Sequence, residues 1–285
     1  MSQVQEWRAR VADAETRRYL ECLRAVRRKA SVSRVHALRT ATRRLLALVA
    51  LSAALDPKGG YRKLRAALLP PFKAAGRVRD LQLMQRVVGR YGRRHPEAEP
   101  LQSHLRGRLD KQQQRLARRV AGGRERRISR RLRALRDRAQ TPAATPGSAA
   151  VARARLRREL ERTRRTMHAR SRSVATHDAA SVHRARLAFK EHRYQLELTG
   201  ALFRSAPSAP LHRLRQFQSA LGAITDRTVL LQLIDAFVRR RPRRAASLDS
   251  YRRRIERERS ALAARHLAEL VAARRARSRA SSRRS

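Results

Sequence analysis

Residues 182–198, VHRARLAFKEHRYQLEL, place basic and apolar side chains on separate faces of one helix. The polar residues follow one another in steps of three and four: His183, Arg186, Lys190, Arg193 and Glu197. At about 100° per residue, these steps gather the five side chains into one stripe roughly 80° wide. Phe189 and Leu196 fall on a neighbouring face. The stretch therefore predicts a helix with an apolar face and an ordered cationic face.

The same pattern occurs a second time, at residues 35–49, VHALRTATRRLLALV. His36, Arg39 and Arg43 occupy its first three polar positions, and His36 precedes His183 by 147 residues. A shorter motif, Gly-x-x-x-Asp, is also repeated: its glycines are Gly76 and Gly222, which lie 146 residues apart. Two different motifs that recur at nearly one offset indicate that the chain consists of two homologous halves.

The rest of the chain also predicts helices, because no segment shows sustained period-two alternation. We expect an all-α fold of about ten helices, arranged as two pseudo-symmetric antiparallel bundles whose basic stripes face a shared central groove or channel. Thr, Pro and Gly near the midpoint, TPAATPGS, predict a linker at residues 141–148. The first half would then span residues 1–140 and the second residues 149–276, followed by a disordered basic tail at residues 277–285.

Capping and helix-breaking residues give approximate helix boundaries. Helices are expected over residues 6–30, 34–55, 61–75, 81–91, 97–140 with a break near residue 122, 151–173, 181–203, 211–221, 226–240 and 247–276. Ser33 would cap the second of these helices, and Asp80 would cap the fourth. The Pro70-Pro71 pair predicts a kink or a break in the third helix, which Gly76 would end.

The charge of the chain is strongly unbalanced, with 71 Lys and Arg residues against 22 acidic ones and a net charge of +49. Such a charge would repel itself unless a polyanion or counterions were nearby. A GC-rich genome could explain many exposed arginines. That bias would not place His, Arg and Lys at matching steps in two separate helices, so the stripes need another explanation.

The sequence has a single cysteine and no apolar segment typical of a signal peptide or a membrane span. The single cysteine, Cys22, excludes an internal disulfide and a cysteine-based metal cluster. The first ten residues lack an apolar run, and no window of 18 residues is free of charge. We expect a soluble, cytoplasmic protein that does not enter a membrane and that needs no metal and no cofactor.

Both repeated motifs resemble those of the CHAD family, named for a conserved histidine α-helical domain. That family has a His-x-x-Arg-x-x-x-Arg-Arg-x-Arg helix, a Gly-x-x-Arg-Asp turn and a His-x-x-Arg-x-x-x-Lys-x-x-Arg-Tyr-x-x-Glu helix. This chain matches the pattern over nearly its whole length but has Leu46 and Thr225 where arginines are expected, so the two halves need not contribute equally.

The resemblance implies binding of inorganic polyphosphate and an association with polyphosphate granules. The candidate polyphosphate-binding residues are His36, Arg39, Arg43, Arg44, Lys73, Arg79, His183, Arg186, Lys190, Arg193 and Tyr194. Arginine suits this role because its planar guanidinium fits phosphate oxygens, and a row at helical spacing can meet successive phosphates. The two histidines could donate to phosphate and make binding depend on pH, or they could pack against neighbouring helices.

The acidic residues of the motifs have structural interpretations. Asp80 and Asp226 could cap helices or hold an arginine in place, and both roles are simpler than acid–base catalysis. Glu197 lies on the basic stripe, where it would orient Arg193 or Tyr194.

No set of residues supports catalysis, so we expect a protein that is not an enzyme. Phosphate-binding loops, nucleophile elbows and the Glu-x-Glu-x-Lys signature of triphosphate tunnel enzymes are absent. A phosphohydrolase is the weakest alternative because metal-binding carboxylates are lacking. Net charge alone would equally support nucleic-acid binding, although aromatic residues for base stacking are few. The length of bound polymer, the oligomeric state and the biological role stay open.

Overall fold

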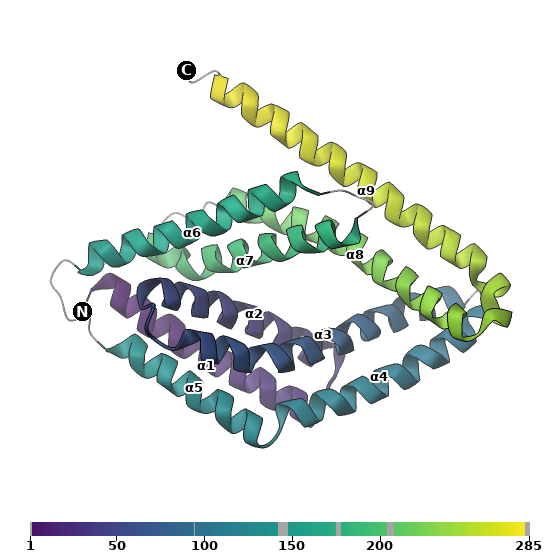
Figure 1. Ribbon diagram of the computed structural model, residues 1–285, viewed down its shortest axis with the longest axis horizontal. Helices are drawn as coiled ribbons and strands as arrows, with labels where there is room; N and C mark the ends of the chain where they lie inside the picture. The colour runs from purple at the N-terminus through teal and green to yellow at the C-terminus, as the bar shows by residue number, and fades with distance from the viewer. Residues whose placement is uncertain (1, 94, 142–147, 175–177, 204–207, 283–285) are drawn as a thin grey trace.

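The computed structural model describes residues 2–93, 95–141, 148–174, 178–203 and 208–282 (Figure 1). Within these ranges the chain forms helices and no strands, which confirms the expected all-α fold. The helices are α1 (Gln3–Arg28), α2 (Val32–Leu55), α3 (Tyr61–Gly92), α4 (Glu99–Val120), α5 (Gly123–Gln140), α6 (Ser148–Arg172), α7 (Ala179–Phe203), α8 (Ser208–Arg240) and α9 (Ala245–Ser282). Two short 3-10 helices, η1 (Pro96–Ala98) and η2 (Pro242–Arg244), precede α4 and α9.

The two motif helices, α2 and α7, pack against each other. Each has a sequential neighbour on either side, because α2 contacts α1 and α3, whereas α7 contacts α6 and α8. Figure 1 shows α6 and α7 on one side of the molecule and α1 to α5 on the other, with α8 running from α7 to the far end of α3 and α4, and with α9 extending away toward the C-terminus. Segments about 147 residues apart in sequence therefore meet where the two groups of helices join.

The larger apolar core crosses this junction. It contains buried residues of α1 to α5 together with Tyr194 and Leu198 of α7 and Phe237 of α8. A smaller core lies within the second group of helices, around Phe189 and Ile224. Because one core is shared, the contact between the two groups is part of what stabilises the fold.

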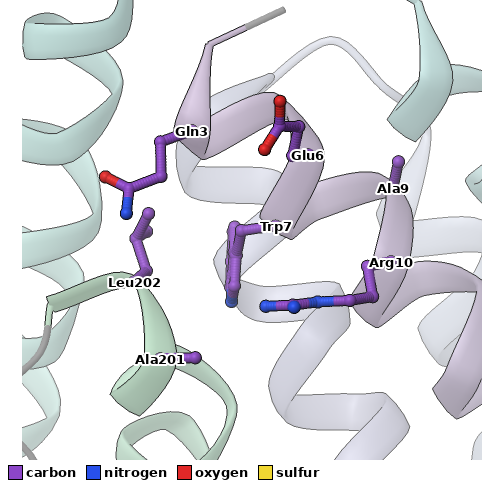
Figure 2. Close-up of a pocket in the computed structure, with 7 residues that line it drawn as sticks. All are labelled: Gln3, Glu6, Trp7, Ala9, Arg10, Ala201 and Leu202. Atoms are coloured by element: carbon purple, nitrogen blue, oxygen red, sulfur yellow. The ribbon is translucent and has the colours of Figure 1, made fainter.

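The single tryptophan reinforces the contact between α1 and α7. Trp7 is 3% exposed, and its indole Nε1 donates to the backbone oxygen of Leu198 at 2.8 Å. Figure 2 shows its ring extending from α1 into a pocket that the end of α7 closes with Ala201 and Leu202. Burial of the ring and a satisfied indole N–H together fix the position of α1 on α7.

The expected division of the third helix is wrong, because α3 runs without a break from Tyr61 to Gly92 and contains Pro70 and Pro71. Each internal proline removes a backbone hydrogen bond and costs about 3 kcal/mol in a helix. Tertiary packing offsets this cost, because Leu68 and Val78, on either side of the prolines, are fully buried.

A second expected break is also wrong. Helix α8 is continuous from Ser208 to Arg240, so Gly222 and Asp226 lie inside it and no new helix begins at residue 226. Near the start of the chain, Ser31 caps α2 in place of Ser33, since its Oγ accepts from the backbone N–H of Arg34 at 3.4 Å.

One further expected helix boundary is confirmed and another is wrong. Gly122, with a positive φ of 67°, separates α4 from α5 as expected. Helix α9 continues to Ser282, so helical backbone extends into the expected basic tail. Most of the expected linker at residues 141–148, and the start of the turn expected after residue 204, lie outside the described residues. Among the described helices, none combines the length and apolar character that crossing a membrane requires.

Candidate functional site

Cations from both motif helices come together where α2 packs on α7, next to α3. We call this set the central cation cluster: Arg39 and Arg43 of α2, Arg79 of α3, and Arg186 and Lys190 of α7. Each arginine in it is partly buried, and Lys190 is only 6% exposed. The repeated sequence pattern thus becomes one group of neighbouring positive charges.

Lys190 experiences the strongest effect of this crowding. Burial, followed by repulsion from Arg43, Arg186 and Arg39, lowers the pKa of its amine to about 6. At neutral pH the amine is therefore largely uncharged in the unliganded protein. An anion placed among these groups would favour the charged amine, so the binding of an anion and the uptake of a proton are coupled here.

The two arginines of α2 share an aromatic neighbour. The guanidinium carbons of Arg39 and Arg43 lie 5.1 and 5.4 Å from the ring centroid of Phe72 on α3. Burial lowers the pKa of both, to about 10 for Arg43, where repulsion from Arg39 adds to the effect. Sequence reasoning did not find Phe72, although an aromatic residue four positions before Gly76 was a usable signal. Its ring positions the two guanidinium groups through cation–π contacts.

Two glycines allow motif arginines to approach neighbouring helices closely. A Cβ added to Gly76 of α3 would lie 2.6 Å from Nη1 of Arg39, and one added to Gly222 of α8 would lie 3.7 Å from Nε of Arg186. In both halves, the arginine that follows the motif histidine by three residues lies beside a glycine of the next helix: Arg39 of α2 beside Gly76 of α3, and Arg186 of α7 beside Gly222 of α8. Close approach explains the glycine at position 76, whereas at Gly222 a Cβ would make an ordinary contact; neither glycine ends a helix.

The aspartates of the same motifs lie inside helices, so their interpretation as N-caps is wrong. Asp80 favours the charged form of Arg39, which fits the alternative role of an arginine partner. Burial raises the pKa of Asp226, and the opposite charge of Arg186 acts against that rise. The carboxylates of Asp80 and Asp226 thus partly balance the charges of Arg39 and Arg186.

Two donors in the central cation cluster lack hydrogen-bond partners within the described part of the chain. They are Nη1 of Arg79 and Nε of Arg186, both of which are buried. Leaving a buried polar group unsatisfied costs about 1–3 kcal/mol, and more for a charged one. Oxygens of an anion at this position would satisfy them.

Arg44 and Glu197 belong to a different network. Arg44 donates to Glu15 of α1 at 2.6 Å and to Glu197 of α7 at 3.3 Å, so this candidate phosphate ligand is held between two carboxylates. Glu197 also accepts from Arg193 at 2.6 Å and from Arg215 at 3.4 Å. These ion pairs link α1, α2, α7 and α8, and they make Arg44 less available to a ligand than the central arginines.

Tyr194 lies beneath the cations and is 5% exposed. Tyr194 favours the charged form of the Arg43 guanidinium, which acts against the lowering of its pKa by burial. The guanidinium of Arg193 lies 4.3 Å from the centroid of its ring. This geometry lets Tyr194 orient two arginines from α2 and α7.

Both motif histidines are exposed but are close enough to the cluster to be affected by it. Partial burial lowers the pKa of His36, and repulsion from Arg79, Arg43 and Arg39 lowers it further. Partial burial also lowers the pKa of His183, where Arg186 is the leading repulsive charge. Both imidazoles are therefore neutral near pH 7 in the unliganded protein.

A hollow of about 630 Å³ lies beside His36, at the start of α2. Besides that histidine, Ser31, Ser33, Arg79 and Arg86 line it. Arg86 was not among the expected site residues, although it follows Arg79 by seven positions, which places both on one face of α3. Lys73 lies exposed on the same helix.

Within the described residues, no group of three or more His, Cys, Asp or Glu side chains could hold a metal ion.

Comparison with known proteins gives one family and one fold. The sequence model of the CHAD domain family matches residues 10–235 of this chain. The crystal structure of the CHAD domain from the plant Ricinus communis is 20% identical, with a TM-score of 0.71 over 94% of this chain and 89% of that one. PptA from Streptomyces chartreusis is 18% identical, with a TM-score of 0.70 over 94% of this chain and 99% of that one. No curated protein sequence matches significantly.

Proposed function

The chain belongs to the CHAD family, and on that basis we propose that it is a non-catalytic protein that binds inorganic polyphosphate through the central cation cluster. The observation that carries the proposal is the position of Lys190, a buried amine among the arginines of α2 and α7, whose pKa burial and then repulsion from Arg43, Arg186 and Arg39 lower to about 6. Such repulsion is unfavourable in a protein that binds nothing there. A polyanion would remove it and would satisfy the buried donors of Arg79 and Arg186.

The arrangement of the cations suits a linear polymer of phosphate. Arg39 and Arg43 are one helical turn apart on α2, as are Arg186 and Lys190 on α7, so each pair repeats at about 5–6 Å. Each guanidinium can donate two hydrogen bonds in a plane to phosphate oxygens. Two such rows on packed helices would hold successive phosphates from two sides. Association with polyphosphate granules in the cytoplasm would follow from this binding.

The aromatic residues of the site favour polyphosphate over nucleic acid. Single-strand binders stack bases on accessible rings. Here the ring of Phe72 lies under two guanidinium groups, and Tyr194 is 5% exposed and lies next to a third. Both rings are engaged by arginines of the site, so the site suits a ligand that consists of phosphates alone.

A pair of charge-matched variants tests this function. The central triple variant replaces Arg39, Arg43 and Arg186, which are all charged at neutral pH, with Gln. The control triple variant replaces three exposed arginines of α5 with Gln: Arg126, Arg130 and Arg133. Because a hydrogen bond to a charged group contributes about 1.5–3 kcal/mol, the central triple should bind polyphosphate at least about 100-fold more weakly than the parent.

Titration calorimetry at physiological salt would measure these affinities, and circular dichroism would check that both variants fold. The control triple should lose far less affinity than the central triple. Equal losses would mean that bulk charge does the binding, and the proposed site would be wrong. Competition with DNA at matched phosphate concentration addresses the ligand: if DNA displaces long-chain polyphosphate, the protein is a nucleic-acid binder instead.

A further inference from the structure

A second basic hollow, of about 580 Å³, lies between α4 and the end of α8, away from the central cation cluster. We call it the α4–α8 groove. Its cationic lining consists of Arg108, Lys111 and Arg115 of α4 and Arg240 of α8. Gly107 also lines it, and because no atom lies within 4 Å of where its Cβ would be, the α4 backbone is open to the groove there.

The cations of α4 share one narrow face. At about 100° per residue, Arg108, Lys111 and Arg115 fall within about 60° of one another. The acidic residues of this helix, Glu99 and Asp110, lie more than about 120° around from the middle of that face. The wall of the groove that α4 supplies is therefore positive without acidic residues between its cations.

The wall that α8 supplies shows the same segregation of charge. Asp235, the acidic residue nearest the groove in the sequence of α8, pairs with Arg252 of α9 at 2.9 Å. Arg240, by contrast, lines the groove. Both walls are therefore positive, whereas many exposed arginines elsewhere pair with carboxylates, as Arg162 does with Glu159 at 2.7 Å.

Three arginines lie close to one imidazole that lines the groove, His104. His104 of α4 lies with its ring centroid 5.3 Å from that of Phe237, which is 1% exposed, and the guanidinium of Arg241 lies 4.9 Å from the same ring. Burial lowers the pKa of His104, and repulsion from Arg108, Arg241 and Arg240 lowers it further. Positive charge from two helices thus converges at this point.

We propose that the α4–α8 groove is a second binding site for inorganic polyphosphate, which holds a distant segment of the same long chain that occupies the central cation cluster. The identity of the ligand rests on the proposed function, whereas the location of the site rests on the groove itself. Phe237, which packs beside His104, is buried and offers no ring face to a base, whereas the cations of the groove offer phosphate contacts.

The separation of the two sites sets a requirement on chain length. Helix α8 passes both, since a Cβ at Gly222 would lie 3.7 Å from Nε of Arg186 and Ala236 lines the groove. These positions are 14 residues apart, or about 21 Å at 1.5 Å per residue. A short oligophosphate would occupy one site at a time. A long chain that reaches both would bind more tightly, because its second contact is intramolecular.

The test compares two ligands and three proteins. A groove triple variant, with Arg108, Lys111 and Arg115 changed to Gln, is set beside the control triple variant and the parent. For long-chain polyphosphate, the groove triple should bind about tenfold or more weakly than the control triple, because it loses the second contact. Its slope of log affinity against log salt should also be shallower than that of the control. Tripolyphosphate should distinguish the two triples much less.

The imidazole of His104 provides a site-specific reading. Its pKa, followed by nuclear magnetic resonance, should rise when long-chain polyphosphate binds the parent, because a nearby polyanion favours the charged ring. Equal losses in the two triples, or a His104 pKa that long-chain polyphosphate leaves unchanged, would overturn the second site. Failure of the proposed function is a different result: the central triple variant would then bind tripolyphosphate as well as the parent does.

Discussion

Replacing Gly76 with alanine should separate stability from polyphosphate binding, because the added methyl group would meet Arg39, an arginine of the proposed binding site. The new Cβ would lie 2.6 Å from Nη1 of Arg39, whereas ordinary contact begins at about 3.4 Å. The guanidinium is the end of a flexible side chain, so it would move and the helix backbone would stay. Gly222→Ala is a matched control, because its Cβ would meet Arg186 at 3.7 Å, an ordinary contact.

The two substitutions should affect stability in the same direction and binding differently. Both glycines lie inside long helices, where Gly→Ala gains about 1 kcal/mol in helix propensity. Gly222→Ala should keep this gain, and Gly76→Ala should keep part of it. A displaced Arg39 loses a charge-assisted contact that contributes about 1.5–3 kcal/mol, so Gly76→Ala should bind polyphosphate about 10-fold to 100-fold more weakly.

Urea unfolding would give the stabilities, and titration calorimetry at one pH and one salt concentration would give the affinities. The expected result is two variants at least as stable as the parent, of which only Gly76→Ala binds weakly. If both bind like the parent, the position of Arg39 does not matter to the ligand. If both bind weakly, the difference between the 2.6 Å and 3.7 Å contacts has no functional consequence, and the reasoning fails.

Three further predictions concern titrating groups. The pKa of Lys190 falls from 10.5 to about 6 on folding, so stability should rise with pH between those values; Lys190→Met should remove that rise and stabilise the protein at pH 7 by up to about 5 kcal/mol, measured by urea unfolding. Polyphosphate affinity should increase as pH falls below about 6.5, because a bound polyanion raises the lowered pKa values of His36 and His183. Calorimetry should find less proton uptake in a His36→Gln, His183→Gln double variant, and an unchanged value would make both histidines packing residues. Burial lowers the pKa of His192 to about 4, so about 3 kcal/mol of stability should be lost as pH falls from 6.5 to 4; a His192→Leu variant with the same acid sensitivity would contradict this.

The fold class and most of the cations in the candidate site were predictable from the sequence because both depend on local periodicity. Steps of three and four residues place His183, Arg186 and Lys190 on one helix face whatever the rest of the chain does. The repeat at an offset of about 147 then identified Arg39 and Arg43 as their counterparts. A motif that recurs with its spacing intact carries more information than composition, which in this chain would have indicated only a polyanion partner.

The helix boundaries show where local rules failed. Pro70 and Pro71 ordinarily end or kink a helix, and Gly76 and Gly222 often follow one. In this chain all four lie inside helices. Sequence propensities are worth about 1–3 kcal/mol per residue, and burial of several leucine-sized side chains can exceed that. Only the assembled core reveals whether burial or the unfavourable helix propensity of these residues contributes more.

What the sequence determined by itself was the chemistry of each motif helix: its apolar face, its row of cations and its membership in a repeated pair. What only the tertiary structure decided was which cations gather beside one another and which form ion pairs with carboxylates. Arg43 and Arg44 are adjacent in sequence, yet Arg43 joins Lys190 in the central cation cluster whereas Arg44 binds Glu15 and Glu197. The physical reason is that adjacent residues point about 100° apart on a helix, so they meet different neighbours, and those neighbours come from segments far away in the chain.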